Sequence, residues 1–338
     1  MRDFRDHVEI LLALPYVDAL LQDTQVRIAA RVKEKRLQKA GHSQAWRHLP
    51  AKWQLFDTDR REVRTMSDIL PSAGRPRFVL VFEGGAFVYP GIDLGFTRTI
   101  AVSDGQLDLV TLSMRPLVIS IDGFLRAAEY DQIVSLMDKD KGREAAEFRT
   151  SQLLFMDSDR YSFLRAIDSR VANLTGQPTS HQEQVQVLKY EVGQYYLPHL
   201  DYWEPSFYQD PQVVQMTEAG HKNRLCTVFW YLSDCDGGYT AFPDAPIQQN
   251  GVSQVLYESD DEQARGRPYV TNTREVSQLE GTLTCPYGLR VPPHKGKAIL
   301  FYSLLPNGQG DYMSSHSACA VTAGTKWAAN KWVWNKRR

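Results

Sequence analysis

The chain has 338 residues, of which 43% are hydrophobic and 23% are charged, proportions that are ordinary for a globular protein. Its length slightly exceeds what one hydrophobic core usually supports, so we expect one large domain with an accessory segment. A formal net charge of −1 gives no general affinity for polyanions, which argues against nucleic acid as a partner.

The amino terminus carries a pattern that loosely imitates a signal peptide, because Arg2 and Arg5 precede an apolar stretch. Acidic residues interrupt both parts, and we interpret the stretch as an amphipathic helix with no clear signal peptide. No run approaches the roughly 18 to 20 apolar residues of a transmembrane segment. The four cysteines lack zinc-site spacing and are too few for a disulfide-built fold, so we expect reduced, mostly buried thiols and leave the compartment open.

The first part of the chain differs in character from the rest. Residues 8–40 place apolar side chains at helical spacing among charges, with a basic run toward the end. The next stretch, to about Arg77, is polar, contains three prolines and predicts a linker. We therefore predict a helical, basic N-terminal appendage and linker over residues 1–75, followed by a separate domain over residues 76–338.

From Phe78 onward, short runs rich in β-branched and aromatic residues predict strands. Two helices are expected to follow, at Ala127–Lys139 and over residues 159–176, the second ending at Gly176. The later strands are expected over residues 185–192, 224–233, 297–305, 314–323 and 326–335. A polar insertion at residues 247–290 is predicted to be a surface loop. The pattern predicts a mainly β fold with flanking helices (α+β) and a double-stranded β-helix, or jelly-roll, core.

The strongest local motif is YLPHLD, which ends in His199 and Asp201. Side chains two apart on a strand share a face, so both can address one point. With one distant histidine they would form the two-His-one-carboxylate site of non-haem iron(II). On spacing alone the motif is weak. His316 lies inside the apolar run SSHSACAV, where a single histidine is more often a buried core residue than a metal ligand.

Three segments, in order, carry a resemblance to a known family. They are VLKYEVGQYYLPHLDYWEP, RLCTVFWYLSDCDGGYTAFP and VPPHKGKAILFYSLLPNGQGDYMSSHSACAVTAGTKWAANKWVW. Over roughly residues 78–335, the chain resembles the prolyl 4-hydroxylase family of iron(II)- and 2-oxoglutarate-dependent dioxygenases. The resemblance implies that His199, Asp201 and His316 hold the iron and are catalytic. It also implies that Lys326 binds the far carboxylate of 2-oxoglutarate, and a buried carboxylate does need a partner charge.

Other residues are assigned by the same resemblance. Tyr190 and Thr227 match residues whose hydroxyls help to fix 2-oxoglutarate, and Tyr196 and Trp332 match aromatic positions on the substrate side. For Trp332, plain core packing is the alternative. The segment TAGT predicts a hairpin turn that returns Lys326 alongside the strand of His316, in a register that sequence does not define.

The chain also departs from the family pattern. Tyr239 stands where the family usually has an acidic residue, and Ala320 stands where it usually has proline. Neither change removes an expected ligand. Both leave the choice of substrate open.

The activity that the resemblance implies is hydroxylation of peptidyl proline at C4, with O2 consumed and 2-oxoglutarate decarboxylated to succinate. Ascorbate is the expected reductant for oxidised iron, and the expected partner is a proline-containing peptide or protein. Alternatives are a dioxygenase acting on another residue or a small molecule, or a catalytically silent peptide-binding relative. The resemblance favours the endoplasmic reticulum, with the cytoplasm as the alternative; the oligomeric state is left open.

Overall fold

The computed structural model describes residues 53–57, 79–83, 88–89, 91, 93–140, 143–144, 150–245, 285, 288–305 and 308–338. The predicted helix over residues 8–40 lies outside these ranges. The chain divides into two compact units, Met1–Ile92 with Leu305–Gln309, and Asp93–Leu304 with Gly310–Arg338. Each unit is described by itself.

In the first unit, strand β1 (Trp53–Asp57) pairs antiparallel with β2 (Val79–Glu83). Strand β1 falls in the stretch predicted to be a linker, so that prediction is wrong over these five residues. A short strand that pairs with a distant one leaves little local pattern, because its stability comes from the partner. The boundary near residue 76 stays a prediction, and β1 and β2 pair across it.

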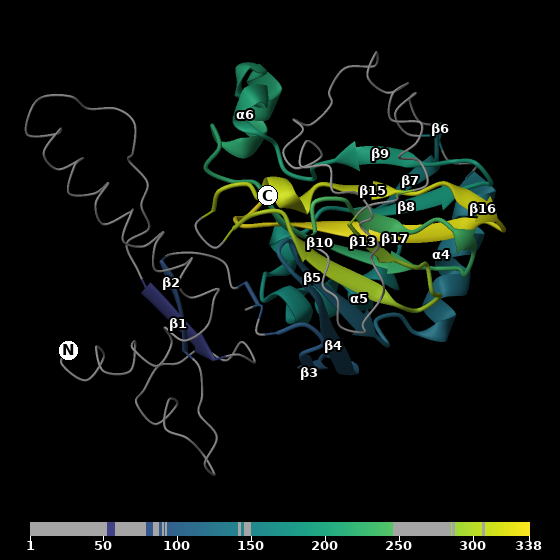
Figure 1. Cartoon of the computed structure of the whole chain (residues 1–338), viewed down its shortest axis with the longest axis horizontal. Coiled ribbons are helices and arrows are strands. Elements are labelled where there is room, and N and C mark those ends of the chain that lie inside the picture. The colour runs from purple at the N-terminus through teal and green to yellow at the C-terminus, as the bar shows by residue number, and fades with distance from the viewer. Residues whose placement is uncertain are drawn as a thin grey trace, which may run out of the picture. The chain divides into compact units, whose positions relative to one another are not determined.

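The second unit is built on a nine-stranded antiparallel sheet (Figure 1). Its order is β3-β4-β5-β14-β10-β17-β8-β7-β6. The strands are β3 (Thr97–Val102), β4 (Gly105–Met114), β5 (Leu117–Asp122), β6 (Arg143–Glu144), β7 (Gln152–Met156), β8 (Val185–Tyr190), β10 (Arg224–Tyr231), β14 (Ala298–Tyr302) and β17 (Lys326–Trp334). The central strands β8, β10, β14 and β17 coincide with runs that the sequence predicts as strands.

A second sheet has four antiparallel strands in the order β13-β12-β15-β9. They are β13 (Leu289–Val291), β12 (Thr240–Phe242), β15 (His316–Ala318) and β9 (Tyr196–His199). A smaller pair joins β11 (Asp236–Gly237) to β16 (Val321–Ala323). Two antiparallel sheets with flanking helices confirm the predicted mainly β, jelly-roll fold. Strand β13 also shows that the predicted loop over residues 247–290 ends in regular structure.

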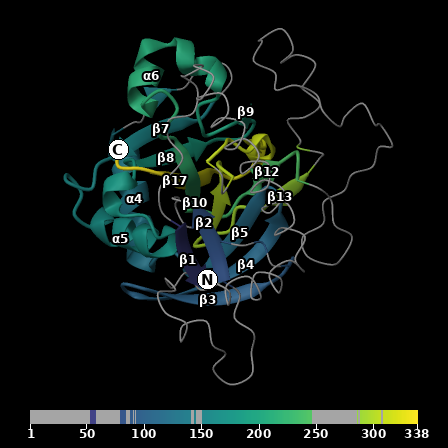
Figure 2. The same ribbon diagram turned by 90° about the vertical axis from the view of Figure 1, so that its left-hand side faces the viewer.

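Helices α4 (Ala127–Asp140) and α5 (Leu164–Thr175) lie on one side of the nine-stranded sheet (Figure 2). Both were expected from helical spacing. In α5, Leu164, Ile167, Val171 and Leu174 are buried, as one apolar helix face requires. Gly176 closes the helix with a left-handed φ of 73°, which glycine adopts without steric cost. Helix α6 (Pro211–Thr217) was not expected from the sequence; Pro211 begins it and the Asp210 side chain caps it.

The central strand β10 separates the helix side of the large sheet from the interior. Trp230 is fully buried and its ring lies 5.4 Å from that of Phe124. The Phe124 carbonyl accepts a hydrogen bond from Arg170 of α5 at 2.7 Å, which ties this layer to the helix. The alternate residues Thr227 and Phe229 line a cavity on the opposite face. The interior face of this sheet therefore forms one wall of the cavity.

The cysteines correct one prediction. Cys285 and Cys319 form a disulfide, so the expectation of reduced thiols is wrong for this pair. Cys226 and Cys235 are free. Sequence spacing gave no signal, because the two partners are brought together by the pairing of β12 with β13 and β15.

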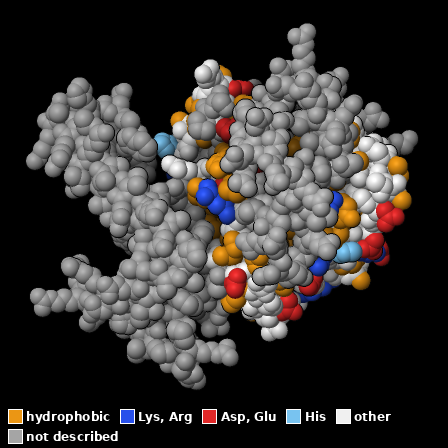
Figure 3. All heavy atoms as spheres, viewed as in Figure 1, with side chains coloured by type: hydrophobic (Ala, Val, Ile, Leu, Met, Phe, Trp, Pro, Cys, Tyr) orange, Lys and Arg blue, Asp and Glu red, His pale blue; other side chains and the backbone are white. Residues whose placement is uncertain are grey.

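Among the described residues, no helix is long and apolar enough to cross a membrane. On the face drawn in Figure 3, Lys and Arg side chains and Asp and Glu side chains occur among hydrophobic ones. Charges of both signs accord with the net charge of −1.

Candidate metal centre

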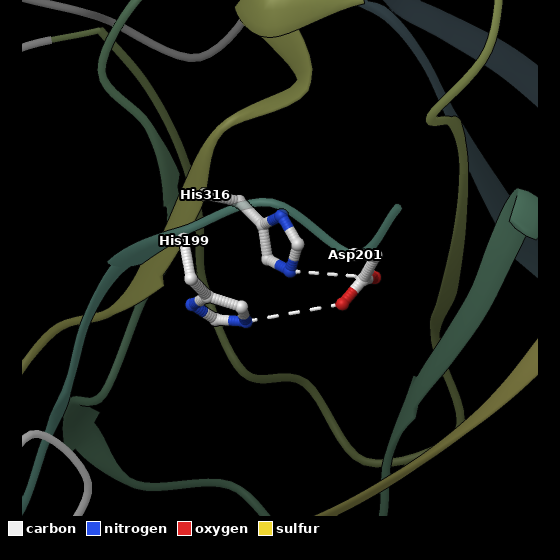
Figure 4. Close-up of side chains that lie close together, drawn as sticks. All are labelled: His199, Asp201 and His316. Atoms are coloured by element: carbon white, nitrogen blue, oxygen red, sulfur yellow. Dashed lines mark ion pairs between the residues drawn. The ribbon is translucent and has the colours of Figure 1, made fainter. Parts of the chain in front are cut away.

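Three side chains that could hold a metal ion converge between the two sheets. His199 ends β9, Asp201 follows two residues later, and His316 begins β15. Strands β9 and β15 pair antiparallel with His199 directly opposite His316. Figure 4 shows both imidazoles directed toward the Asp201 carboxylate. The structure thus brings together all three residues expected to form the centre.

The three side chains are close enough together to bind one metal ion. His199 Nε2 lies 3.9 Å from Asp201 Oδ1, and His316 Nε2 lies 3.6 Å from Asp201 Oδ2. The three possible ligand atoms all lie within 4.8 Å of one another. The side chains of Asp201 and His316 are 5% and 9% exposed, and that of His199 is 18% exposed. Solvent therefore reaches the three groups from the His199 side.

Both histidines are oriented by the backbone in the same way. His199 Nδ1 lies 2.8 Å from the Leu197 carbonyl, and His316 Nδ1 lies 3.0 Å from the Ser314 carbonyl. A carbonyl only accepts, so Nδ1 carries the proton and donates it. Each Nε2 then presents its lone pair toward Asp201. Metal-binding histidines are fixed by such a bond from the second ring nitrogen. Two neutral imidazoles and one carboxylate fit the iron(II) donor set.

The Asp201 carboxylate is also held in place. Thr227 donates its hydroxyl proton to Asp201 Oδ2 at 2.6 Å, and Arg224 donates to the Asp201 backbone carbonyl at 3.1 Å. Burial alone would raise the pKa of the Asp201 carboxyl, but positive charge at the positions of the two histidines, the Arg224 guanidinium and the Thr227 hydrogen bond together lower it. The carboxylate is therefore ionised and correctly placed for a cation.

The sequence assigned no role to Arg224, but in the structure this residue contacts several side chains of the candidate site. Its guanidinium stacks on the Trp332 ring at 3.6 Å and on the Trp203 ring at 4.3 Å. It also binds the Glu183 carboxylate, with Nε to Oε1 at 2.6 Å. A planar guanidinium suits this combination of stacking and paired hydrogen bonds, which an ammonium does not reproduce. The only local signal was an arginine at the start of a strand, which is too common to indicate a site.

A cavity of about 150 Å³ opens beside the three groups. Its lining mixes apolar and polar side chains: Gln186, Leu188, Tyr190, Tyr196, His199, Leu200, Asp201, Arg224, Thr227, Phe229, Thr240, His316, Ser317, Ala318, Asn330 and Trp332. Such a mixture is typical of small-molecule sites. The Tyr196 ring stacks on His199 at 3.7 Å between centroids. Tyr190, Thr227, Tyr196 and Trp332, all expected near the site, therefore line one cavity.

Lys326 begins β17, directly opposite Tyr190 on β8. It is fully buried, and within the described ranges no hydrogen-bond acceptor reaches its Nζ. The Nζ lies over the rings of Tyr190 and Phe229 at 5.3 and 5.5 Å, and both rings line the cavity. Burial lowers the pKa of this ammonium to about 7, and Cys235 partly opposes that effect. Lys326 is thus a cation behind the cavity wall that lacks a partner anion.

The hairpin expected at TAGT does not form, because the strands on either side of it pair with other strands and lie in different sheets. Val321–Ala323 is strand β16, and Lys326 begins β17 in the nine-stranded sheet, whereas His316 lies in the four-stranded sheet. The prediction that Lys326 returns alongside the His316 strand is therefore wrong. A turn defines where a strand restarts, but sheet packing decides which strand it joins.

The two departures from the family pattern lie close to the disulfide and the β11–β16 pair. Tyr239 packs on the cluster of Ala241, Cys285 and Cys319, and the Arg290 guanidinium lies over its ring at 5.4 Å. The Ala320 carbonyl accepts a hydrogen bond from Gly238 at 2.9 Å. Neither residue is among those that line the cavity.

Comparison with known proteins agrees with this geometry. Residues 185–334 match the model of the 2OG-Fe(II) oxygenase superfamily. The chain is 32% identical to "Probable prolyl 4-hydroxylase 4" of Arabidopsis thaliana over 234 residues, which covers 66% of this chain and 68% of the relative. It is 31% identical to "Probable prolyl 4-hydroxylase 3" of the same plant over 261 residues, covering 72% of this chain and 80% of the relative.

Among solved structures, the viral collagen prolyl hydroxylase of Paramecium Bursaria Chlorella virus-1 in its 2OG complex is 21% identical. It aligns with a TM-score of 0.43 over 65% of this chain and 96% of that chain. The family model covers the segments that hold all three candidate ligands. The chain therefore belongs to the prolyl 4-hydroxylase family, within the 2OG-Fe(II) oxygenase superfamily.

Proposed function

We propose that His199, Asp201 and His316 hold iron(II) in this 2-oxoglutarate-dependent dioxygenase, and that its substrate is peptidyl proline, hydroxylated at C4. One observation carries the assignment of the centre: both imidazoles, each fixed through Nδ1, direct Nε2 toward one buried carboxylate. The names of the plant relatives support proline as the residue that is hydroxylated. When bound, the iron supplies the oxidation of a C–H bond by O2, coupled to decarboxylation of 2-oxoglutarate to succinate.

The three side chains would supply three of the donors that iron(II) takes, and all three line the cavity, from which further ligands would come. An open face is what a bidentate 2-oxo acid and O2 require. Thr227 and Arg224 keep the Asp201 carboxylate in place through its side chain and its backbone carbonyl, respectively. The chain's own contribution is therefore to fix the donors before the co-substrate arrives, which lowers the cost of ordering them.

We assign Lys326 to the distal carboxylate of 2-oxoglutarate. A buried ammonium without an acceptor is costly, and a carboxylate that reaches it would relieve this cost. Tyr190 lies opposite Lys326 and lines the cavity, which supports its assignment to the same molecule. Thr227 is also assigned to 2-oxoglutarate. Thr227 donates its one hydroxyl proton to Asp201, so its oxygen has only acceptor capacity left. We therefore assign its contact with 2-oxoglutarate to a bridging water that donates to the Thr227 oxygen.

The peptide is proposed to enter beside Tyr196 and Trp332, which line the same cavity as His199. Trp332 is half-buried with Arg224 stacked on one face, so it is a rigid surface on which a proline ring packs. Ascorbate is proposed as the reductant that returns oxidised iron to the iron(II) state. We also propose that the catalytic domain spans residues 76–338.

The test combines product analysis with a matched histidine control. The protein is incubated with iron(II), 2-oxoglutarate, ascorbate and an array of proline-containing peptides, and succinate and a peptide mass gain of one oxygen are measured. His294→Ala serves as the control, because His294 also lies near a carboxylate, Asp234, at 3.6 Å, but on the surface. His316→Ala should stop both signals and His294→Ala should not. Succinate without peptide oxidation across the array would reject proline as the substrate.

A further inference from the structure

A free thiol lies beside the buried lysine. A methyl group on Gly238 would lie 2.9 Å from Cys235 Sγ and 3.3 Å from Lys326 Cδ, so both side chains border the space beside the Gly238 backbone. Gly238 has a left-handed φ of 59° and no side chain, which leaves space for both neighbours. Cys235 is half-buried and takes no part in a disulfide.

The thiol and the ammonium share one aromatic compartment. Cys235 and Phe229 both pack against the hydrophobic cluster that contains Tyr190. The Lys326 Nζ lies over the rings of these same two residues. Across the described part of the chain, this Nζ has no hydrogen-bond acceptor although it is fully buried. The compartment therefore contains a cation that any anion formed at Cys235 would pair with.

We propose that Cys235 is a site of oxidative modification whose sulfinate product pairs with Lys326 and competes with the distal carboxylate of 2-oxoglutarate. The proposal rests on the proposed function, because that function assigns Lys326 to 2-oxoglutarate. Neither Cys235 nor any other cysteine lines the cavity, so the sulfur acts on the co-substrate through Lys326 rather than by direct contact.

The oxidant is hydrogen peroxide, and each step balances. The sulfur attacks one peroxide oxygen, an S–O bond forms and the O–O bond breaks. The departing hydroxide takes the thiol proton and leaves as water, so Cys235 becomes a sulfenic acid. A second peroxide oxidises this sulfenic acid to the sulfinic acid and is itself reduced to water. The sulfinic acid gives up its proton to solvent and remains as an anion beside Lys326.

The surroundings of Cys235 make this oxidation slow. Burial raises the pKa of the Cys235 thiol, Lys326 opposes that effect, and Asp236 and Asp234 add to it. Because the thiolate is the reacting form, oxidation is expected to accumulate during prolonged peroxide exposure. Bound 2-oxoglutarate neutralises Lys326 and removes the one charge that favours the thiolate. The co-substrate should therefore protect Cys235.

The experiment treats the full metal-free chain with hydrogen peroxide, with and without 2-oxoglutarate, and removes the peroxide with catalase. Peptide mass spectrometry measures oxygen addition at Cys235. Manganese(II) and 2-oxoglutarate are then added, and calorimetry measures the affinity for 2-oxoglutarate. Cys235→Ser tests the site, and Cys226→Ser is the matched control, because Cys226 is the other free thiol and is fully buried. Circular dichroism confirms that each treated sample is folded.

We expect two oxygen atoms on Cys235, slower addition when 2-oxoglutarate is present, and an affinity for 2-oxoglutarate about tenfold or more weaker after treatment. Dithiothreitol should not restore it, because a sulfinate is not reduced by thiols. The ratio of the 2-oxoglutarate association constant after peroxide treatment to that before treatment should stay near one for Cys235→Ser. For Cys226→Ser, this ratio should fall. An unoxidised Cys235, or an oxidised one with unchanged affinity, would overturn the inference. An untreated chain that does not bind 2-oxoglutarate would instead refute the proposed function.

Discussion

His199 and His316 lie directly opposite each other on the paired strands β9 and β15, with their ring centroids 4.4 Å apart. Residues facing one another across an antiparallel pair have closely spaced Cβ atoms, so strand pairing alone brings the two imidazoles to one place. The Nδ1 bonds to the carbonyls two residues earlier then set the ring orientation. The proposed centre is therefore a product of backbone register.

The first prediction concerns the three proposed ligands. His199→Ala, Asp201→Ala and His316→Ala should each abolish 2-oxoglutarate-dependent succinate formation, because an open three-ligand site has no spare protein donor. Metal content after dialysis and the thermal transition are measured beside His294→Ala. A variant that keeps near-normal turnover with metal bound would remove its residue from the centre.

Thr227→Val should weaken metal binding and leave the fold intact. Valine keeps the shape but cannot donate to Asp201 Oδ2, and loss of such a supporting bond typically costs about 10- to 100-fold in metal affinity. Titration with iron(II) under anaerobic conditions gives the affinity. The control is Thr175→Val, since Thr175 is also buried but donates to a helix carbonyl. Equal metal affinity in the two variants would show that the Thr227 bond does not orient the carboxylate.

Lys326→Ala should raise the 2-oxoglutarate concentration needed for turnover, while metal binding persists. The substitution removes the charge proposed to meet the distal carboxylate and leaves the three metal donors in place. Lys326→Arg should recover part of the loss only if the compartment accepts a longer, planar group. Initial rates against 2-oxoglutarate concentration measure the effect. An unchanged requirement in Lys326→Ala would contradict the assignment.

Binding of 2-oxoglutarate should depend on pH through Lys326. The pKa of this ammonium in the free protein is about 7, so below pH 7 it is charged and binding needs no proton. Above pH 7 it is neutral, and binding must take up one proton, so the affinity should fall by about tenfold per pH unit. Calorimetry in buffers of different ionisation enthalpy measures the uptake. A flat affinity between pH 7 and 9, or equal uptake in Lys326→Met, would contradict this linkage.

A chain beginning at Arg75 tests the predicted domain boundary. Every proposed ligand lies in the second compact unit, so the shortened chain should still form succinate. It lacks β1, the pairing partner of β2, and the exposed β2 edge should make it more prone to aggregate than the full chain. Succinate output and light scattering are compared for both chains. An inactive, unfolded product would place the first residues within the catalytic core.

Local patterns predicted the elements whose stability depends on their own sequence. The spacing of Ile167, Val171 and Leu174 indicated α5, and the apolar run rich in β-branched and aromatic residues in β10 indicated a strand, because such patterns are visible within a few residues. Strand β1 and helix α6 were missed because both are short; β1 depends on its pairing with β2, whereas α6 is capped locally by Asp210. Family resemblance, and not spacing, singled out His316 and Lys326.

Long-range contacts escaped the sequence for the same reason. The stacking of Arg224 on Trp203 and Trp332 requires three segments to converge, and no local sequence pattern in any one of them predicts this contact. The Cys285–Cys319 disulfide and the approach of Cys235 and Lys326 to Gly238 likewise depend on how distant strands pack.

The sequence by itself determined the donor types of the proposed centre and the HxD spacing that puts His199 and Asp201 near each other. It also determined, through turn and strand patterns, that the chain forms antiparallel sheets. Only the tertiary structure decided that His316 pairs with His199 and that Lys326 lies in the opposite sheet, fully buried without an acceptor among the described residues. The physical reason is that register and sheet membership minimise the energy of the whole packed core, whereas a local pattern constrains only its own segment.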